Sequence, residues 1–164
     1  MKKVLSLLLS FALICALSGC TQSNESPKVA VNFYYCTPAE DYETIHQTIF
    51  PEIREGADYG SDLQPLLNDY LRGPVSENLV NPFPESTSVE SLAQTGTEVC
   101  LVLSSRFARL TGIDLILASS CISYTVFELT GCQSVRISVD GLLLDGDPEI
   151  VIRNNDILLD YQTE

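Results

Sequence analysis

The spacing of apolar residues divides the first half of the chain into three predicted elements. Residues 29–36 (VAVNFYYC) place alternate side chains on one apolar face, which predicts a β-strand. Residues 42–54 are rich in β-branched side chains but contain a proline, so they predict a second, irregular strand. Residues 63–71 repeat apolar side chains at helical spacing, and Gly73 and Pro74 end this amphipathic helix.

The second half of the chain opens with a predicted hairpin. Residues 89–93 and 98–103 are strand-like and flank a glycine. The second of these segments is apolar on both faces, which indicates a strand in the centre of a sheet. Residues 113–129 carry another helical stripe, for which Asp114 is the expected N-cap and Gly131 the expected stop.

Further strands follow this second helix. Residues 135–139 (VRISV) alternate apolar and polar side chains, which predicts a long edge strand with one solvated face. Asp140 and Gly141 then turn the chain, and residues 150–152 and 157–159 predict short additional strands. The order β-β-α-β-β-α-β with a C-terminal β extension predicts a single α+β domain. Its expected architecture is a mixed or antiparallel sheet with two helices packed on one face.

The N-terminal segment has the pattern of a bacterial lipoprotein signal peptide. Two lysines precede an uncharged run of 14 residues, 4–17, which covers about 21 Å as a helix and is too short for a ~30 Å hydrocarbon core. Small residues at 18–19 then precede Cys20. This arrangement resembles a lipobox, which implies removal of residues 1–19 and lipidation of Cys20. The alternative is an ordinary signal peptide with an incidental cysteine.

Removal of residues 1–19 changes the composition of the chain. It leaves 145 residues with a formal charge of −15, because the removed segment holds two of the nine basic residues and none of the 22 acidic ones. Residues 20–28 are then a lipidated cysteine with a short polar tether, and residues 29–164 are one folded domain. So acidic a domain excludes nucleic acid as a partner. The acidic excess is either a solvated surface or a face for a basic partner.

Four cysteines remain in the domain. The pair Cys121 and Cys132 fits a disulfide poorly, because Cys121 lies well inside a predicted helix and Cys132 just beyond its end. Cys36 and Cys100 both fall in predicted strands and could meet across a sheet, so a disulfide between them is one interpretation. The other is that all four are free cysteines that behave as small apolar residues, which the absence of CxxC spacing favours.

No motif in the sequence indicates catalysis or a cofactor. His46 is the single histidine, and the chain has no nucleophile elbow, P-loop or dinucleotide fingerprint. Asp145, Asp147 and Glu149 lack the spacing of a calcium loop and indicate an acidic turn. We therefore expect no enzyme activity, no metal and no cofactor. A hydrolase that uses a pair of carboxylates is the catalytic alternative.

Three blocks of sequence carry a family likeness. They are LLNDYLRGP (66–74), NPFPESTSVESL followed by VCLVLSSRF (81–92 and 99–107), and YTVFELTGCQSVRISVDG (124–141). Together they resemble the GerMN domain, a sporulation and spore-germination module of envelope lipoproteins. The core of the likeness covers residues 61–141.

The resemblance implies a non-catalytic module that packs against copies of itself or other envelope proteins, with residues 135–139 as a candidate edge. Together with the N-terminal pattern, it predicts a scaffold protein in sporulation or germination, lipid-anchored on the extracytoplasmic face of the cell membrane. The alternative is an accessory protein that binds cell-wall glycan or a small ligand. Phe33, Tyr34 and Tyr35 are the aromatic residues that suggest this alternative.

Overall fold

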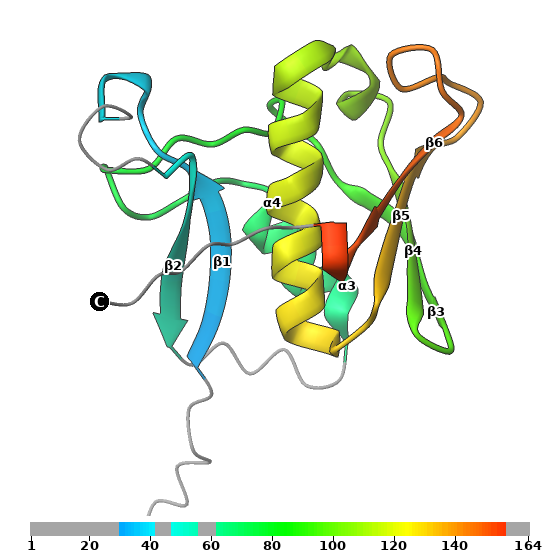
Figure 1. The fold of residues 1–164 in the computed structure, drawn as a ribbon, viewed down its shortest axis with the longest axis horizontal. Helices are drawn as coiled ribbons and strands as arrows, with labels where there is room; N and C mark the ends of the chain where they lie inside the picture. The colour runs from blue at the N-terminus through cyan, green and yellow to red at the C-terminus, as the bar shows by residue number, and fades with distance from the viewer. Residues whose placement is uncertain (1–29, 42–46, 56–61, 157–164) are drawn as a thin grey trace, which may run out of the picture.

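The computed structural model describes residues 30–41, 47–55 and 62–156 of the chain (Figure 1). Within these ranges the helices and strands follow the predicted order. Their bounds are β1 Ala30–Cys36, β2 Ile49–Glu55, α3 Leu63–Tyr70, β3 Val89–Thr95, β4 Glu98–Leu103, α4 Gly112–Thr130, β5 Ser134–Val139 and β6 Glu149–Arg153. The predicted signal peptide, the tether with Cys20 and the predicted strand 157–159 lie outside the described residues.

The strands form two sheets. β1 and β2 pair antiparallel, and the other four strands form a sheet of order β3-β4-β5-β6. In this larger sheet β4 and β5 are parallel, while the outer pairs are antiparallel. α4 connects the two parallel strands. The predicted α+β class is confirmed, as is the central position of β4, and the strands are divided between two sheets.

Helix α4 lies between the two sheets (Figure 1). It packs against β1 on one side and against β5 and β6 on the other, and α3 packs beside β3. The side chains of β4 and β5 that face the helices are buried: Val99, Leu101, Leu103, Val135, Ile137 and Val139. By length and composition α4 is apolar enough to cross a membrane, and 50% of its most apolar window is buried in the protein. α4 is rich in apolar residues because a sheet packs against it on each of two sides.

The ends of the helices agree in part with the predictions. Gly131 ends α4 in the left-handed conformation, with φ of 66°, as predicted. At the other end α4 begins at Gly112, so Asp114 lies in the first turn and is not the N-cap. Thr111 occupies the cap position without a side-chain hydrogen bond, and Gly112 N donates to Asp145 Oδ2 at 3.0 Å instead. The acidic turn after β5 therefore supplies the missing acceptor.

β5 is an interior strand, so its prediction as an edge is wrong. β6 covers it with an antiparallel ladder, and the edges of the larger sheet are β3 and β6. The predicted solvated face of β5 is confirmed. On that face Arg136 lies 3.2 Å from Glu98 and also pairs with Glu149, which joins three neighbouring strands. These contacts lower the pKa of Glu98 and raise that of Arg136.

Candidate functional site

Segment 66–74, which carries part of the family likeness, holds the junction of α3 with both sheets. Asn68 Oδ1 accepts a hydrogen bond from Val89 N at 2.7 Å, which ties α3 to the start of β3. The Tyr70 hydroxyl donates to the Tyr34 carbonyl at 2.7 Å, which ties the same helix to β1. These polar groups are engaged in structural contacts.

The loop after α3 is held just as tightly. Gly73 has φ of +115°, and a Cβ at this position would lie 2.9 Å from Asn81 Nδ2, so only glycine fits. The Gly73 carbonyl accepts a hydrogen bond from Arg54 Nη2 at 2.7 Å. Arg54 also lies 4.8 Å from the Phe33 ring centroid and 2.5 Å from Glu52. The guanidinium thus joins the smaller sheet to this loop.

The aromatic residues of β1 are core residues. Phe33, Tyr34 and Tyr35 are 2%, 9% and 0% exposed, so they offer no face to a glycan at the surface. The Tyr35 hydroxyl donates to the Tyr70 carbonyl at 2.8 Å. Burial raises the pKa of both Tyr35 and Tyr70 above its ordinary value. The residues that suggested glycan binding stabilise the fold instead.

The cysteines lie in different parts of the fold. Cys36 Sγ, at the end of β1, is 4.0 Å from Cys121 Sγ in α4, and both residues are buried. Cys100 Sγ is 3.7 Å from Glu98 Oε1 on the solvated face of β4, away from the helices. Cys132 is buried just beyond α4, and all four are free thiols. The structure therefore places Cys36 beside Cys121 and not beside Cys100.

Asp145 and Asp147 lie in a turn between β5 and β6, and Glu149 is the first residue of β6. Leu144 N donates to the Asp147 carbonyl at 2.6 Å, which closes the turn, and Asp145 has φ of 52°. In residues 30–41, 47–55 and 62–156, no group of three or more His, Cys, Asp or Glu is placed to hold a metal ion. His46 and Cys20, two residues considered from the sequence, lie outside these ranges.

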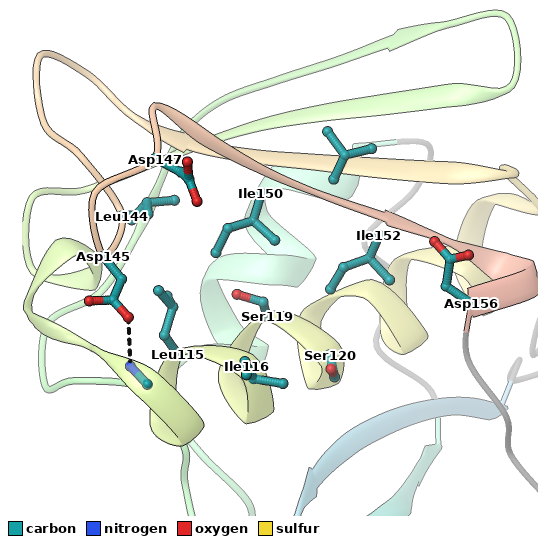
Figure 2. A pocket seen from close by; sticks show the side chains of 12 residues that line it. Leu115, Ile116, Ser119, Ser120, Leu144, Asp145, Asp147, Ile150, Ile152 and Asp156 are labelled. Carbon is teal, nitrogen blue, oxygen red and sulfur yellow. Dashed lines mark hydrogen bonds between the residues drawn. The ribbon is translucent and has the colours of Figure 1, made fainter.

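A groove between α4 and β6 is the candidate binding site (Figure 2). Its volume is about 430 Å³, within the usual size of ligand sites. The walls are apolar and come from α4, β6 and the turn between β5 and β6: Leu115, Ile116, Leu144, Ile150 and Ile152. Ile116 is 60% exposed, so the groove presents apolar surface to solvent. Sequence analysis did not identify this site.

The polar side chains of the groove are the hydroxyls of Ser119 and Ser120 and carboxylates at its rim. Ser119 lines the groove from α4, and its Oγ is fully buried without a hydrogen-bond partner in the described chain (Figure 2). An unpaired buried hydroxyl is unfavourable, and a ligand would relieve that cost only after a local shift of the groove walls exposes Ser119, which is 0% exposed. Asp145 and Asp147 lie at one end of the groove and Asp156 at the other (Figure 2). The groove therefore has apolar walls and acidic ends, and Ser119 Oγ beneath it has no hydrogen-bond partner.

Comparison with known families decides the identity of the domain. The family model named Germane, described as sporulation and spore germination, matches residues 32–145. The chain belongs to this family. The match starts in β1 and ends in the turn after β5, so β6 lies beyond it. A search of curated proteins gives no match.

Two solved GerMN structures share the fold of this Germane-family chain. The first GerMN domain of the sporulation protein GerM from Bacillus subtilis has a TM-score of 0.56 at 15% identity, and the match covers 73% of this chain and 91% of that one. The tandem GerMN domains of the same protein give a TM-score of 0.55 at 18% identity. Here the match covers 73% of this chain but only 41% of the tandem chain. The fold of the chain therefore corresponds to that of one GerMN domain.

Proposed function

We propose that this GerMN-family protein is a lipid-anchored, non-catalytic interaction module on the extracytoplasmic face of the cell membrane, with a role in sporulation or spore germination. The observation that carries the proposal is the family match over residues 32–145. The polar side chains of segment 66–74 described above are engaged within the fold. Such a domain acts through its surface.

The contacts of the groove carboxylates favour binding over catalysis. Glycoside hydrolysis needs two carboxylates of which one holds a proton. Asp145 is engaged with the amide of Gly112, and Asp156 lies 3.8 Å from the guanidinium of Arg153. Both carboxylates therefore have a partner within the domain. The non-catalytic proposal is supported by these contacts.

The anchor is proposed from residues 1–28. Two basic residues, a short apolar run and small residues precede Cys20, and residues 21–28 are a polar tether of at most about 28 Å. The acidic domain is repelled by anionic lipid headgroups, so its own surface does not bind it to the membrane. Two or more acyl chains on the N-terminal cysteine provide stable attachment.

Substitution of Cys20 tests the anchor, with Cys15→Ala as the matched control from the same segment. We expect the wild type and Cys15→Ala in the membrane pellet, released by detergent, and Cys20→Ala in the soluble fraction. The mass of the purified wild type should also exceed that of the polypeptide from residue 20 by the acyl chains. Retention of Cys20→Ala in the pellet would contradict the proposal.

We assign the groove to a partner protein that contributes an apolar segment flanked by lysine or arginine. Apolar side chains of this segment contact Ile116 and Ile150, and the basic groups approach Asp147 at the rim. The formal charge of the chain, −13, also favours a basic partner at long range. When the groove walls shift to admit the segment, one of its backbone groups forms a hydrogen bond with Ser119 Oγ.

Two synthetic peptides with one apolar core test this assignment, one flanked by lysines and the other by glutamates. We expect the lysine peptide alone to bind the full chain in detergent micelles, with affinity that falls as salt is raised. Ile116→Glu and Asp147→Lys should abolish binding. Ile53→Glu is the matched control, because Ile53 is 68% exposed on β2, outside the groove. Equal binding of both peptides, or of neither, would refute the assignment.

A small ligand or a cell-wall glycan is the second candidate, favoured by the volume of the groove and by its hydroxyl and carboxylate groups. Sedimentation with purified peptidoglycan tests it. Binding of the wild type that is lost in Asp147→Asn but kept in Ile53→Glu would favour this candidate. Failure of the protein to sediment would remove it.

A further inference from the structure

We propose that Cys36 and Cys121 are a cross-linking pair, which closes to an intramolecular disulfide between β1 and α4 in an oxidising environment. Their Sγ atoms are 4.0 Å apart, and the residues are 6% and 0% exposed. A disulfide has an S–S distance of about 2.05 Å, so the two sulfurs must approach by roughly 2 Å. The two positions are 85 residues apart in the chain, so the bond would join distant segments.

A neighbouring hydrogen bond fixes the position of β1 relative to α4. Tyr34 N donates to Thr125 Oγ1 at 3.1 Å, and both groups are buried. Tyr34 precedes Cys36 by two residues on the strand, and Thr125 follows Cys121 by four on the helix. The four-residue repeat places Thr125 and Cys121 on the same face of α4, the face that meets β1. The thiols therefore face each other across an established interface.

The two thiols have different access to solvent. Cys36 lines a cavity of about 510 Å³ between the end of β1 and residues 80–84, whereas Cys121 does not line it. The hydrogen bond from the Cys121 thiol lowers the pKa of Cys36, while burial raises the pKa of Cys121. The thiolate is the reactive form, so Cys36 is the sulfur that an oxidant meets first.

The reaction proceeds by thiol–disulfide exchange with an oxidising disulfide, either a small molecule or an extracytoplasmic oxidoreductase. Cys36 loses its proton, and its thiolate attacks one sulfur of the oxidant. The other sulfur of the oxidant leaves as a thiolate, and Cys36 is left in a mixed disulfide. Cys121 then loses its proton and attacks Cys36 Sγ in the mixed disulfide, which expels the second thiolate. One disulfide has formed in the protein. The two cysteine thiols have given up two protons and two electrons, which reduce the oxidant to two thiols.

The other cysteines are separated from this pair. Cys100 lies on the solvated face of β4, beside Glu98, and Cys36 is instead adjacent to Cys121. The inference depends on the proposed export for its oxidising environment, because cytoplasmic thiols are kept reduced. The geometry of the pair does not depend on export, so the two proposals are tested separately.

Peptide mapping of the full chain from cells tests the bond. Free thiols are blocked with N-ethylmaleimide during denaturing lysis, and the protein is digested without reductant. We expect the peptides of Cys36 and Cys121 as one species, lighter by two hydrogen atoms than the two reduced peptides together, which separates on reduction. In Cys36→Ser the Cys121 thiol should become available to maleimide, and the converse should hold for Cys121→Ser. Cys100→Ser is the matched control and should retain the link.

Fractionation of the same cells separates this inference from the proposed export. Maleimide on both Cys36 and Cys121 in chains recovered from the envelope would overturn the inference, as would a link from either residue to Cys100 or Cys132. If the chain is cytoplasmic, export has failed, and the purified chain is then oxidised with glutathione disulfide. Absence of the Cys36–Cys121 link under that condition would overturn the inference, and its presence would support it.

Discussion

Thr125 Oγ1 accepts a hydrogen bond from the backbone amide of Tyr34 at 3.1 Å, in the core of the domain. The carbonyl of Tyr34 accepts from the Tyr70 hydroxyl. Tyr34 stands opposite Pro51 in the β1–β2 ladder, and these two bonds lie on the other side of β1. Side chains of both helices thus close an edge of β1 that another strand would otherwise cover. This explains why the strands form two sheets.

Substitution of Thr125 should reveal this contact. Thr125→Val keeps the shape of the side chain but leaves the amide of Tyr34 buried and unpaired, so we expect a loss of about 1–3 kcal/mol in the free energy of unfolding. Thr125→Ser is the control, because it keeps the hydroxyl and removes only a methyl group. Urea titration followed by circular dichroism measures both. A valine variant as stable as the wild type would show that the hydrogen bond contributes nothing.

Alanine at Gly73 should be more harmful than alanine at Gly131. Gly73 combines φ of +115° with the close approach of Asn81, so we expect Gly73→Ala to cost about 3 kcal/mol in the free energy of unfolding. Gly131 has φ of +66° with open space around it, and its substitution should cost only about 1 kcal/mol. Equal urea midpoints of unfolding for Gly73→Ala and Gly131→Ala would mean that the Asn81 side chain moves aside at little cost.

Tyr35 and Tyr70 should lose their phenolic protons only as the protein unfolds. Burial raises the pKa of Tyr35 and Tyr70 in the folded state above the unfolded value of about 10. The unfolded chain therefore loses these protons first. Their contribution to stability is complete below pH ~10 and is lost as the pH rises toward the folded pKa values.

Phenolate absorbance and circular dichroism, recorded through one alkaline titration, measure this effect. The phenolates of Tyr35 and Tyr70 should appear together with the loss of secondary structure. Tyr35→Phe should remove one of them from that late step. Complete ionisation of all tyrosines with an intact circular dichroism spectrum would contradict the expectation.

Ser119→Ala should separate binding from stability. It removes a buried hydroxyl that has no partner, so the variant should be as stable as the wild type or more stable. Binding of the lysine-flanked peptide should nevertheless weaken. Ser123 is the matched control, since its hydroxyl is also buried and unpaired but does not line the groove. If Ser119→Ala and Ser123→Ala bind the peptide equally, the hydroxyl of Ser119 has no role in recognition.

Among the residues that the structure describes, local spacing was sufficient to predict the order of the helices and strands, while their partners depended on contacts distant in sequence. The alternation of residues 135–139 correctly indicated a half-buried strand, but whether it was an edge depended on β6, which follows ten residues later. The same limit applies to the cysteines. The strand-like segments around Cys36 and Cys100 gave no information on which sheet each would join. The thiol that lies beside Cys36 is that of Cys121, in a helix.

The groove was missed because its parts are unremarkable individually. Leu115 and Ile116 belong to the apolar pattern of a helix, and Asp145 and Asp147 to an acidic turn. Only the return of β6 beside α4 brings them together. One signal was available: the run Leu142–Leu144 after a turn glycine is apolar where a turn is usually polar, and its last residue, Leu144, lines the groove.

The contact between β1 and α4 also determines when the domain can finish folding. The chain is synthesised from its N-terminus, so β1 emerges well before Thr125, which is 91 residues later. During that interval the strand has its apolar side chains and one hydrogen-bonding edge uncovered, and such edges recruit other chains. Until α4 is complete, the uncovered edge of β1 is therefore open to pairing with the same strand of another unfinished chain.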